Sequence, residues 1–325
     1  MEPLNTVIAY INVAVAQVRY PSVCLPVYPA RHETQRPMPK PVRPRAFTVL
    51  FGALSCLLVP GPAHAQTTII IDREPNVIIA AADSKGTPRT GYPSPTVCKL
   101  VQIKPKIFFA SAGLALSPLT HFDINSLATE AASTGDTILG AATRFEPLII
   151  KAYIEAVEEI RRKMPQVYKE QFADGDPVQA AFFGADPDGT LALSVRAWVK
   201  GTNPTGRITF TPAASRNCPG ADCGPGGVMQ EILGHRDEIM AFVSQHPNAA
   251  YEKLGSIESM RFLIQLEIVL EPNSVGPPID VLTVTSDHAT RPFKLSASVC
   301  PEPTSYQEKK GPSPAPQKPS SGEQE

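Results

Sequence analysis

The chain has 325 residues, of which 42% are hydrophobic, and a formal net charge of -1. This length suits one large domain or two small ones with a buried core. Residues 1–66 carry six of the 30 Lys and Arg and two of the 31 Asp and Glu, so 24 basic and 29 acidic groups, a net charge of -5, remain on the rest. An acidic balance argues against a nucleic-acid partner.

Residues 38–65 have the three parts of a secretory signal peptide. Basic residues near Met38 precede an apolar run of 14 residues, 46–59, and the small-x-small triplet AHA ends at Ala65. We therefore expect cleavage after Ala65 and export to the periplasm or the medium. Because signal peptides begin close to their methionine, residues 1–37 are expected to be a non-native extension.

The N-terminal apolar runs are too short to anchor the chain in a membrane. A transmembrane helix needs about 20 apolar residues, and the signal's run has 14. Residues 7–18 are the competing candidate, but Asn12 interrupts that short stretch. The sequence therefore predicts no membrane association for the mature form.

Four cysteines remain after the predicted cleavage, in a compartment where disulfides form. Four cysteines allow three pairings. The short loop CPGADC favours a bridge between Cys218 and Cys223, which leaves Cys98 to pair with Cys300. Paired CxxC spacing is absent and the histidines of the mature chain are scattered, so we expect no metal site.

Four apolar runs open the mature chain and predict two antiparallel hairpins. The turns REPN and Lys104-Pro105 separate the runs within each pair. The second run, VIIAAA, does not alternate, so both faces of that strand should be buried. The expected strands are Thr67–Asp72, Asn76–Asp83, Thr96–Ile103 and Lys106–Ala112.

Helices and further strands follow in blocks. Residues 125–132 and 145–172 have helical spacing of apolar residues, and Pro165 should kink or divide the longer segment. Residues 178–199 predict a hairpin around the turn DPDG, which residues 207–212 extend. Helices over 229–245 and 249–270 and a last strand over 279–285 complete the pattern.

This order of elements predicts an α+β fold over residues 66–300. Two sheets with helices on both outer faces would satisfy it, which is a four-layer αββα sandwich. From Pro301 onward, Pro, Ser, Gln, Glu and Lys dominate the sequence. Residues 301–325 are therefore predicted to be a disordered Pro-rich tail.

Thr67 opens the first predicted strand, and as an N-terminal residue after processing it could act as a nucleophile through its hydroxyl. A hydroxyl needs a base, and a free α-amino group with a pKa of about 8 suits that role. A lysine beside the amine, a carboxylate to orient the lysine and a backbone N–H for the oxyanion would complete such a site. Thr67, Asp83, Lys99 and Gly113 follow one another at intervals of 16, 16 and 14 residues.

The stretches TTIIIDREPNVIIAAADSKGT, VCKLVQI and KIFFASAG resemble the proteasome β subunit and the proteolytic subunit of a bacterial ATP-dependent protease. Both are N-terminal nucleophile (Ntn) hydrolases with an αββα sandwich. The resemblance is ungapped over Thr67–Gly113 and looser over 180–199 and 249–287. It implies a threonine hydrolase that cleaves peptide or other amide bonds without a metal or cofactor.

The resemblance also assigns roles residue by residue. Thr67 would be the nucleophile and its amine the base. Lys99 would tune the amine, Asp83 would orient Lys99, and the N–H of Gly113 would hold the oxyanion. Thr87 falls at the family's substrate-binding threonine, and two residues of a late turn are candidates for support of the site, Glu271 and Ser274.

Two departures from the family leave alternatives open. The family has a glycine-flanked serine where this chain has His235, in the stretch GHRDEI, and a glycine where Gln66 precedes Thr67. The threonine mechanism requires removal of Gln66. The rival functions are a catalytically inactive binding or assembly module and an amidase for a non-peptide amide. A homo-oligomer remains open.

Overall fold

The computed structural model describes residues 67–86, 95–117, 119–133, 135–172, 177–246, 254–293 and 299–304. By its contacts the chain divides into Met1–Gly61 and Pro62–Glu325, and every described residue belongs to the second unit. The predicted extension and signal peptide, the tail beyond residue 304, Gln66 and Thr87 lie outside the described residues.

Ten of the described strands form two antiparallel five-stranded sheets. The first sheet has the order β10 (Met229–Gly234), β1 (Thr68–Arg73), β2 (Ile78–Asp83), β11 (Ile279–Val284) and β12 (Ala289–Phe293). The second has the order β3 (Leu100–Lys104), β4 (Ile107–Ala112), β7 (Val178–Ala185), β8 (Leu191–Thr202) and β9 (Ile208–Cys218). Two short strands, β5 (Leu116–Ser117) and β6 (Phe122–Asp123), pair with each other.

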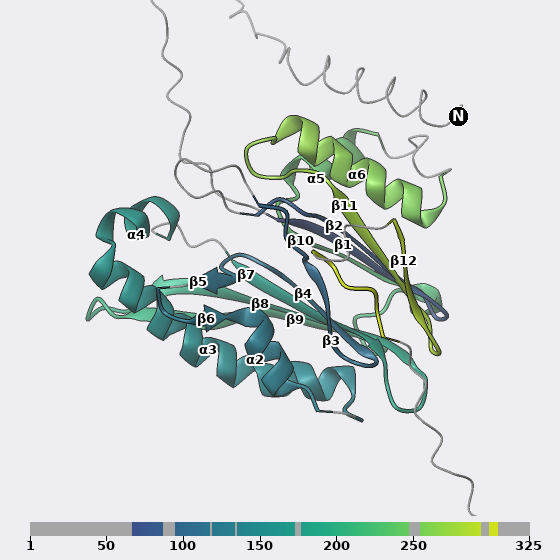
Figure 1. The fold of residues 1–325 in the computed structure, drawn as a ribbon, viewed down its shortest axis with the longest axis horizontal. Coiled ribbons are helices and arrows are strands. Elements are labelled where there is room, and N and C mark those ends of the chain that lie inside the picture. The colour runs from purple at the N-terminus through teal and green to yellow at the C-terminus, as the bar shows by residue number, and fades with distance from the viewer. Residues whose placement is uncertain are drawn as a thin grey trace, which may run out of the picture. The chain divides into compact units, whose positions relative to one another are not determined.

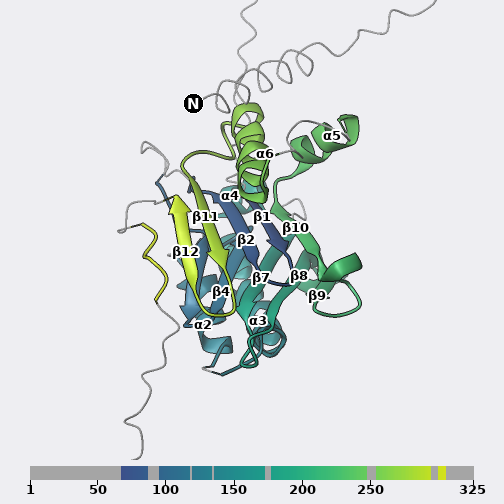
Figure 2. The same ribbon diagram turned by 90° about the vertical axis from the view of Figure 1, so that its right-hand side faces the viewer.

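Helices lie on the outer side of each sheet (Figure 1). α2 (Ile124–Ala131) and α3 (Ile138–Lys163) pack on the second sheet, and α4 (Pro165–Gln171) continues from α3. α6 (Ser256–Leu270) packs on β1 and β2, with α5 (Asp237–Gln245) against it (Figure 2). The fold thus combines helices with antiparallel sheets, as an α+β fold requires.

Two hydrophobic cores lie on either side of the second sheet. Phe108 of β4 and Phe183 of β7 stack in the core between the sheets, with ring centroids 5.7 Å apart. The adjacent residues Phe109 and Phe182, 4.9 Å apart, belong instead to the core under α2 and α3. Because successive side chains of a strand alternate between faces, these central strands are apolar on both.

The two opening hairpins are confirmed, and β2 is buried along its whole length as VIIAAA predicted. Pro165 divides the long helical segment, also as predicted. The first of the two helices begins earlier than expected, at Ile138. Thr137 explains this start, since its side chain accepts the N–H of Gly140 at 3.0 Å and caps the helix.

The predicted helix over 229–245 is wrong in its first half. Residues Met229–Gly234 form strand β10, antiparallel to β1, and the helix begins only at Asp237. Met229, Glu231 and Leu233 are the buried positions, which is a period of two and not of 3.6. The helical pattern of the following residues concealed this short alternation.

The strand predicted over 279–285 is present as β11, but it is not the last. β12 follows it at the edge of the first sheet. Its Pro292 is typical of an edge strand, and its buried Arg291 pairs with Asp280 of β11. A charged residue and a proline made this segment look unlike a strand. The predicted helix over 249–270 is observed from Ser256, and residues 247–253 are not described.

The structure contains both expected disulfides, Cys98–Cys300 and Cys218–Cys223. They link residues separated in sequence by 202 and by 5 positions. This is the cysteine chemistry of an oxidising compartment. None of the described helices is long and apolar enough to cross a bilayer.

The two disulfides should differ in their contribution to stability. A bridge restricts the unfolded chain more when it closes a longer loop, about 5 kcal/mol for Cys98–Cys300 against about 2 kcal/mol for Cys218–Cys223. Denaturant unfolding of the C98A/C300A and C218A/C223A double variants measures both losses. A larger loss for C218A/C223A would contradict this account.

Candidate active site

The peptide unit between Thr67 and Thr68 is held from both sides. The carbonyl of Thr67 accepts the N–H of His235 at 2.8 Å, from the end of β10. The N–H of Thr68 donates to Oδ1 of Asp83 at 2.9 Å, at the end of β2. Thr67 itself is half-buried. The start of β1 is therefore fixed between two neighbouring strands.

Asp83 and Lys99 form a buried ion pair next to this peptide unit. Nζ of Lys99 donates to Oδ1 of Asp83 at 2.8 Å, and the side chains are 8% and 0% exposed. This is the same oxygen that accepts the N–H of Thr68. The structure thus brings Thr67, Asp83 and Lys99 together, as the intervals in the sequence predicted.

Oδ2 of Asp83 is bound separately. It accepts the N–H of Lys85 at 3.2 Å and the N–H of Gly276 at 3.3 Å. Four donors therefore bind the two oxygens of this carboxylate. Its burial leaves neither oxygen without a hydrogen bond, which lowers the cost of burying the charge.

Burial lowers the pKa of Lys99, because a charged ammonium is poorly solvated there. The carboxylate of Asp83 opposes this shift through charge and hydrogen bonding, and the nearby Lys85 adds to it. A residue whose pKa is perturbed by burial and by a specific charged partner is a candidate for a functional site.

The two hairpins reach each other although they lie in different sheets. Lys85 and Thr96 form an isolated antiparallel bridge, and the N–H of Val97 donates to the carbonyl of Ser84 at 2.8 Å. This bridge aligns the segment before β3 with the end of β2. Lys99, which precedes β3, consequently reaches Asp83, whereas its neighbour Cys98 forms the disulfide with Cys300.

Gly113 follows β4, whose end lies beside Thr67. A Cβ at Gly234 would stand 1.7 Å from the carbonyl oxygen of Thr67 and 3.1 Å from Cβ of Ala112, so these two groups are neighbours. Gly113 has a φ of +104°, and a Cβ there would lie 3.2 Å from Cα of Val178. The backbone alone thus requires glycine at this position.

The turn after α6, residues 271–276, also contacts the site through its backbone. Besides the bond from Gly276 to Asp83, the N–H of Ser84 donates to the carbonyl of Gly276 at 3.2 Å. Nζ of Lys85 donates to the carbonyl of Asn273 at 2.8 Å. Ser274 is buried within this turn, and Glu271 stands at its start, where its N–H continues the hydrogen bonding of α6.

Sequence reasoning missed a second side-chain pair, whose histidine contacts Thr67 through its backbone. Nδ1 of His235 lies 2.9 Å from Oε2 of Glu267, whose side chain is fully buried in α6. An acid inside the apolar run FLIQLEIVL was the available signal, because a buried carboxylate needs a partner. The contacts of Lys85 and Gly276 carried no such signal, since the site uses their backbone N–H groups.

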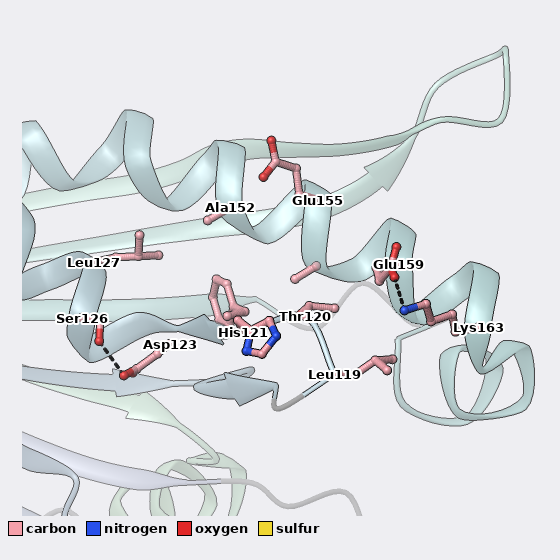
Figure 3. Close-up of a pocket in the computed structure, with 12 residues that line it drawn as sticks. Leu119, Thr120, His121, Asp123, Ser126, Leu127, Ala152, Glu155, Glu159 and Lys163 are labelled. Atoms are coloured by element: carbon pink, nitrogen blue, oxygen red, sulfur yellow. Dashed lines mark hydrogen bonds and ion pairs between the residues drawn. The ribbon is translucent and has the colours of Figure 1, made fainter.

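Two other features involve none of the predicted catalytic residues. A cavity of about 620 Å³ between the β5–β6 turn and α3 is lined by His121, Asp123 and Glu155 among others (Figure 3), and none of the predicted catalytic residues lines it. Cys98, Asp280 and Cys300 lie close enough to ligate a metal. However, the two sulfurs are bonded to each other and Asp280 is paired with Arg291.

The chain matches no protein-family model and no curated protein sequence.

Replacement of Asp83 by Asn should destabilise the protein, because a buried ammonium loses its counter-charge, at a cost of about 3–5 kcal/mol. The loss should shrink with rising pH. The pKa of Lys99 is already lower in the folded than in the unfolded state, and loss of the Asp83 charge should lower it further. The unfolded variant therefore binds more protons than the folded variant, so the stability of the variant rises with pH as Lys99 deprotonates.

Urea unfolding at pH 7 and pH 10 measures both effects. Asp287→Asn, at an exposed carboxylate, is the control and should keep the stability of the wild type. An equal loss for Asp83→Asn at both pH values would show that the uncompensated charge of Lys99 is not its source.

Proposed function

We propose that this protein is an exported N-terminal nucleophile hydrolase of proteasome-like fold that cleaves an amide bond in a peptide substrate. The convergence of Lys99 and the Thr68 N–H on one oxygen of buried Asp83 carries the proposal. A threonine nucleophile needs a fixed backbone, which these bonds supply, and a positive charge near its amine, which is the role we assign to Lys99 in this proposal.

The arrangement of layers supports the same assignment. Helices α5 and α6, the first sheet, the second sheet and helices α2 and α3 follow one another, as an αββα sandwich requires (Figure 1). Thr67 directly precedes β1, which lies in the interior of the first sheet between β10 and β2. The two disulfides agree with export of the mature chain.

In the proposed mechanism, removal of Gln66 frees the α-amino group of Thr67. Oγ of Thr67 then attacks the substrate carbonyl and passes its proton to this amine. The N–H of Gly113 stabilises the resulting oxyanion. The C–N bond breaks as the leaving amine takes the proton, and water hydrolyses the remaining ester to regenerate Thr67.

The charge of Lys99 acts on the amine. A nearby cation disfavours the protonated amine and so keeps more of it in the basic form at neutral pH. Asp83 holds Lys99 in place, and its bond to the N–H of Thr68 fixes Lys99 relative to the start of β1. The same chemistry applied to a non-peptide amide would make the protein an amidase.

The rival function is a binding or assembly module on the same fold. Gln66 favours it, because a retained residue before Thr67 leaves no free amine to act as base.

The N-terminus of the exported protein decides between these two functions. Intact mass and N-terminal sequencing should show a chain that begins at Thr67. A chain that begins only at Gln66, or at its cyclised form, would exclude the threonine mechanism. A β-lactone probe should acylate Oγ of Thr67 in the wild type, and Thr67→Ala should not react.

Lys99→Met should slow acylation by this probe at least tenfold at neutral pH, because the amine loses the neighbouring charge that keeps it basic. The rate is measured by the mass added to the N-terminal peptide over time. Lys104→Met, in the same hairpin but away from Asp83, is the matched control and should react at the rate of the wild type. Equal rates for both variants would remove Lys99 from the mechanism.

A further inference from the structure

Gln179 of β7 forms a hydrogen bond between the two sheets. Its Oε1 accepts the N–H of Gly234, at the end of β10, at 2.6 Å. Ala181 and Phe183 follow on the same face of β7 and lie in the core between the sheets, so the side chain of Gln179 also points toward the first sheet. β10 packs on both β4 and β7. The bond therefore links the second sheet to the strand beside β1.

This bond lies at the end of two strand pairs. In the second sheet, Gln179 is opposite Ala112, the last residue of β4. In the first sheet, Gly234 is opposite Thr68, the first residue of β1. A side chain of one sheet thus holds the backbone of the other at the point where both pairs stop.

The next residues beyond these pairs are the proposed nucleophile and the proposed oxyanion donor. Thr67 directly precedes β1, and the exposed Gly113 directly follows β4. Gly234 lies against both strands, because a Cβ there would stand 1.7 Å from the carbonyl oxygen of Thr67 and 3.1 Å from Cβ of Ala112. On the other strand of the pair, a Cβ at Gly113 would lie 3.1 Å from Cγ2 of Val178.

The nucleophile and the oxyanion donor therefore belong to different sheets, and their separation depends on what holds the sheets together at this end. On the β2 side of β1, Asp83 binds Lys99, which directly precedes β3 of the second sheet. On the β10 side, the bond of Gln179 is a second link. In the proposed mechanism, Oγ of Thr67 and the N–H of Gly113 act on one carbonyl group, and a misplacement of about 1 Å lowers a rate about a hundredfold.

We infer that Gln179 is a positioning residue that sets the distance between Oγ of Thr67 and the N–H of Gly113. It acts through the backbone of Gly234, and its acceptor oxygen carries the role. This inference rests on the proposed function and deepens it, because it makes the rate of the reaction depend on a hydrogen bond between the two sheets.

The test uses the β-lactone probe at saturating concentration on the exported protein, between pH 6 and pH 10. The profile gives the limiting rate constant of acylation and the apparent pKa of the Thr67 amine. Gln179→Met matches the length of the side chain but offers only a weak acceptor. It should lower the limiting rate constant about tenfold or more. The apparent pKa should stay that of the wild type, because Lys99 keeps its place, whereas Lys99→Met should raise it.

Two further variants isolate the acceptor oxygen. Gln179→Glu retains it and should keep the limiting rate constant within about threefold of the wild type. Its charge should raise the apparent pKa of the amine, since a nearby carboxylate favours the protonated form. Gln179→Asn keeps the amide but is one methylene shorter. It should lose rate as Gln179→Met does, and it replaces that variant if Gln179→Met does not fold.

Gln102→Met is the matched control. Gln102 lies in β3 of the same sheet, and its Oε1 likewise accepts a backbone N–H, that of Thr304, at 2.7 Å. The variant should react at the rate of the wild type. Rate constants refer to labelled molecules only, and the fraction labelled at completion reports a loss of folded protein separately.

The outcomes separate the inference from the proposed function. A wild type that never reacts at Thr67 overturns the proposed function and this inference with it. A reactive wild type with an equal limiting rate constant for Gln179→Met overturns the inference alone. So does a Gln179→Glu variant as slow as Gln179→Met, a change in the apparent pKa without a change in the limiting rate constant, or a loss confined to the labelled fraction. An equally slow Gln102→Met would also overturn it.

Discussion

The structure around Thr67 depends on the ion pair and the hydrogen bonds of the Asp83 carboxylate. This carboxylate is fully buried, and a buried charge is tolerated only when it is paired and hydrogen-bonded. Its four donors come from Thr68 in β1, Lys99 before β3, Lys85 after β2 and Gly276 in the turn after α6. Both sheets and one helix connection must therefore be in place before this charge is stabilised, which couples the site to the stability of the fold.

Helix α6 contributes to the site at two points. Glu267, inside the helix, anchors the end of β10, and the turn that follows the helix supplies the N–H of Gly276 to Asp83. The two contacts hold the residues on opposite sides of β1, so the position of Thr67 depends on one helix from both directions. A helix that only covered the sheet would need no buried acid in its apolar face.

Local patterns in the sequence predicted the hairpins, the buried β2 and the Cys218–Cys223 bridge, because turns and short loops encode them within a few residues, and Cys98–Cys300 followed as the remaining pair. Strand β10 was not predicted because its partner, β1, is distant in sequence. Strand β12 was not predicted because it contains the charged Arg291, which pairs with Asp280 of β11. The same distinction applies to the site. Asp83 and Lys99 could be found from their intervals, whereas the backbone donors and the pairing of His235 with Glu267 depend on contacts that no interval records.

The contacts of Thr67 bear on how the proposed activity would begin. Its carbonyl is bound by His235, and the following N–H by Asp83, and neither bond involves the nitrogen of Thr67. Both bonds therefore exist while Gln66 is still attached, and the burial of Lys99 is equally independent of the cleavage. Removal of one residue would then release the amine into a site whose charges and backbone are already arranged. Folding would prepare the proposed active site, and the removal of Gln66 would supply its free amine.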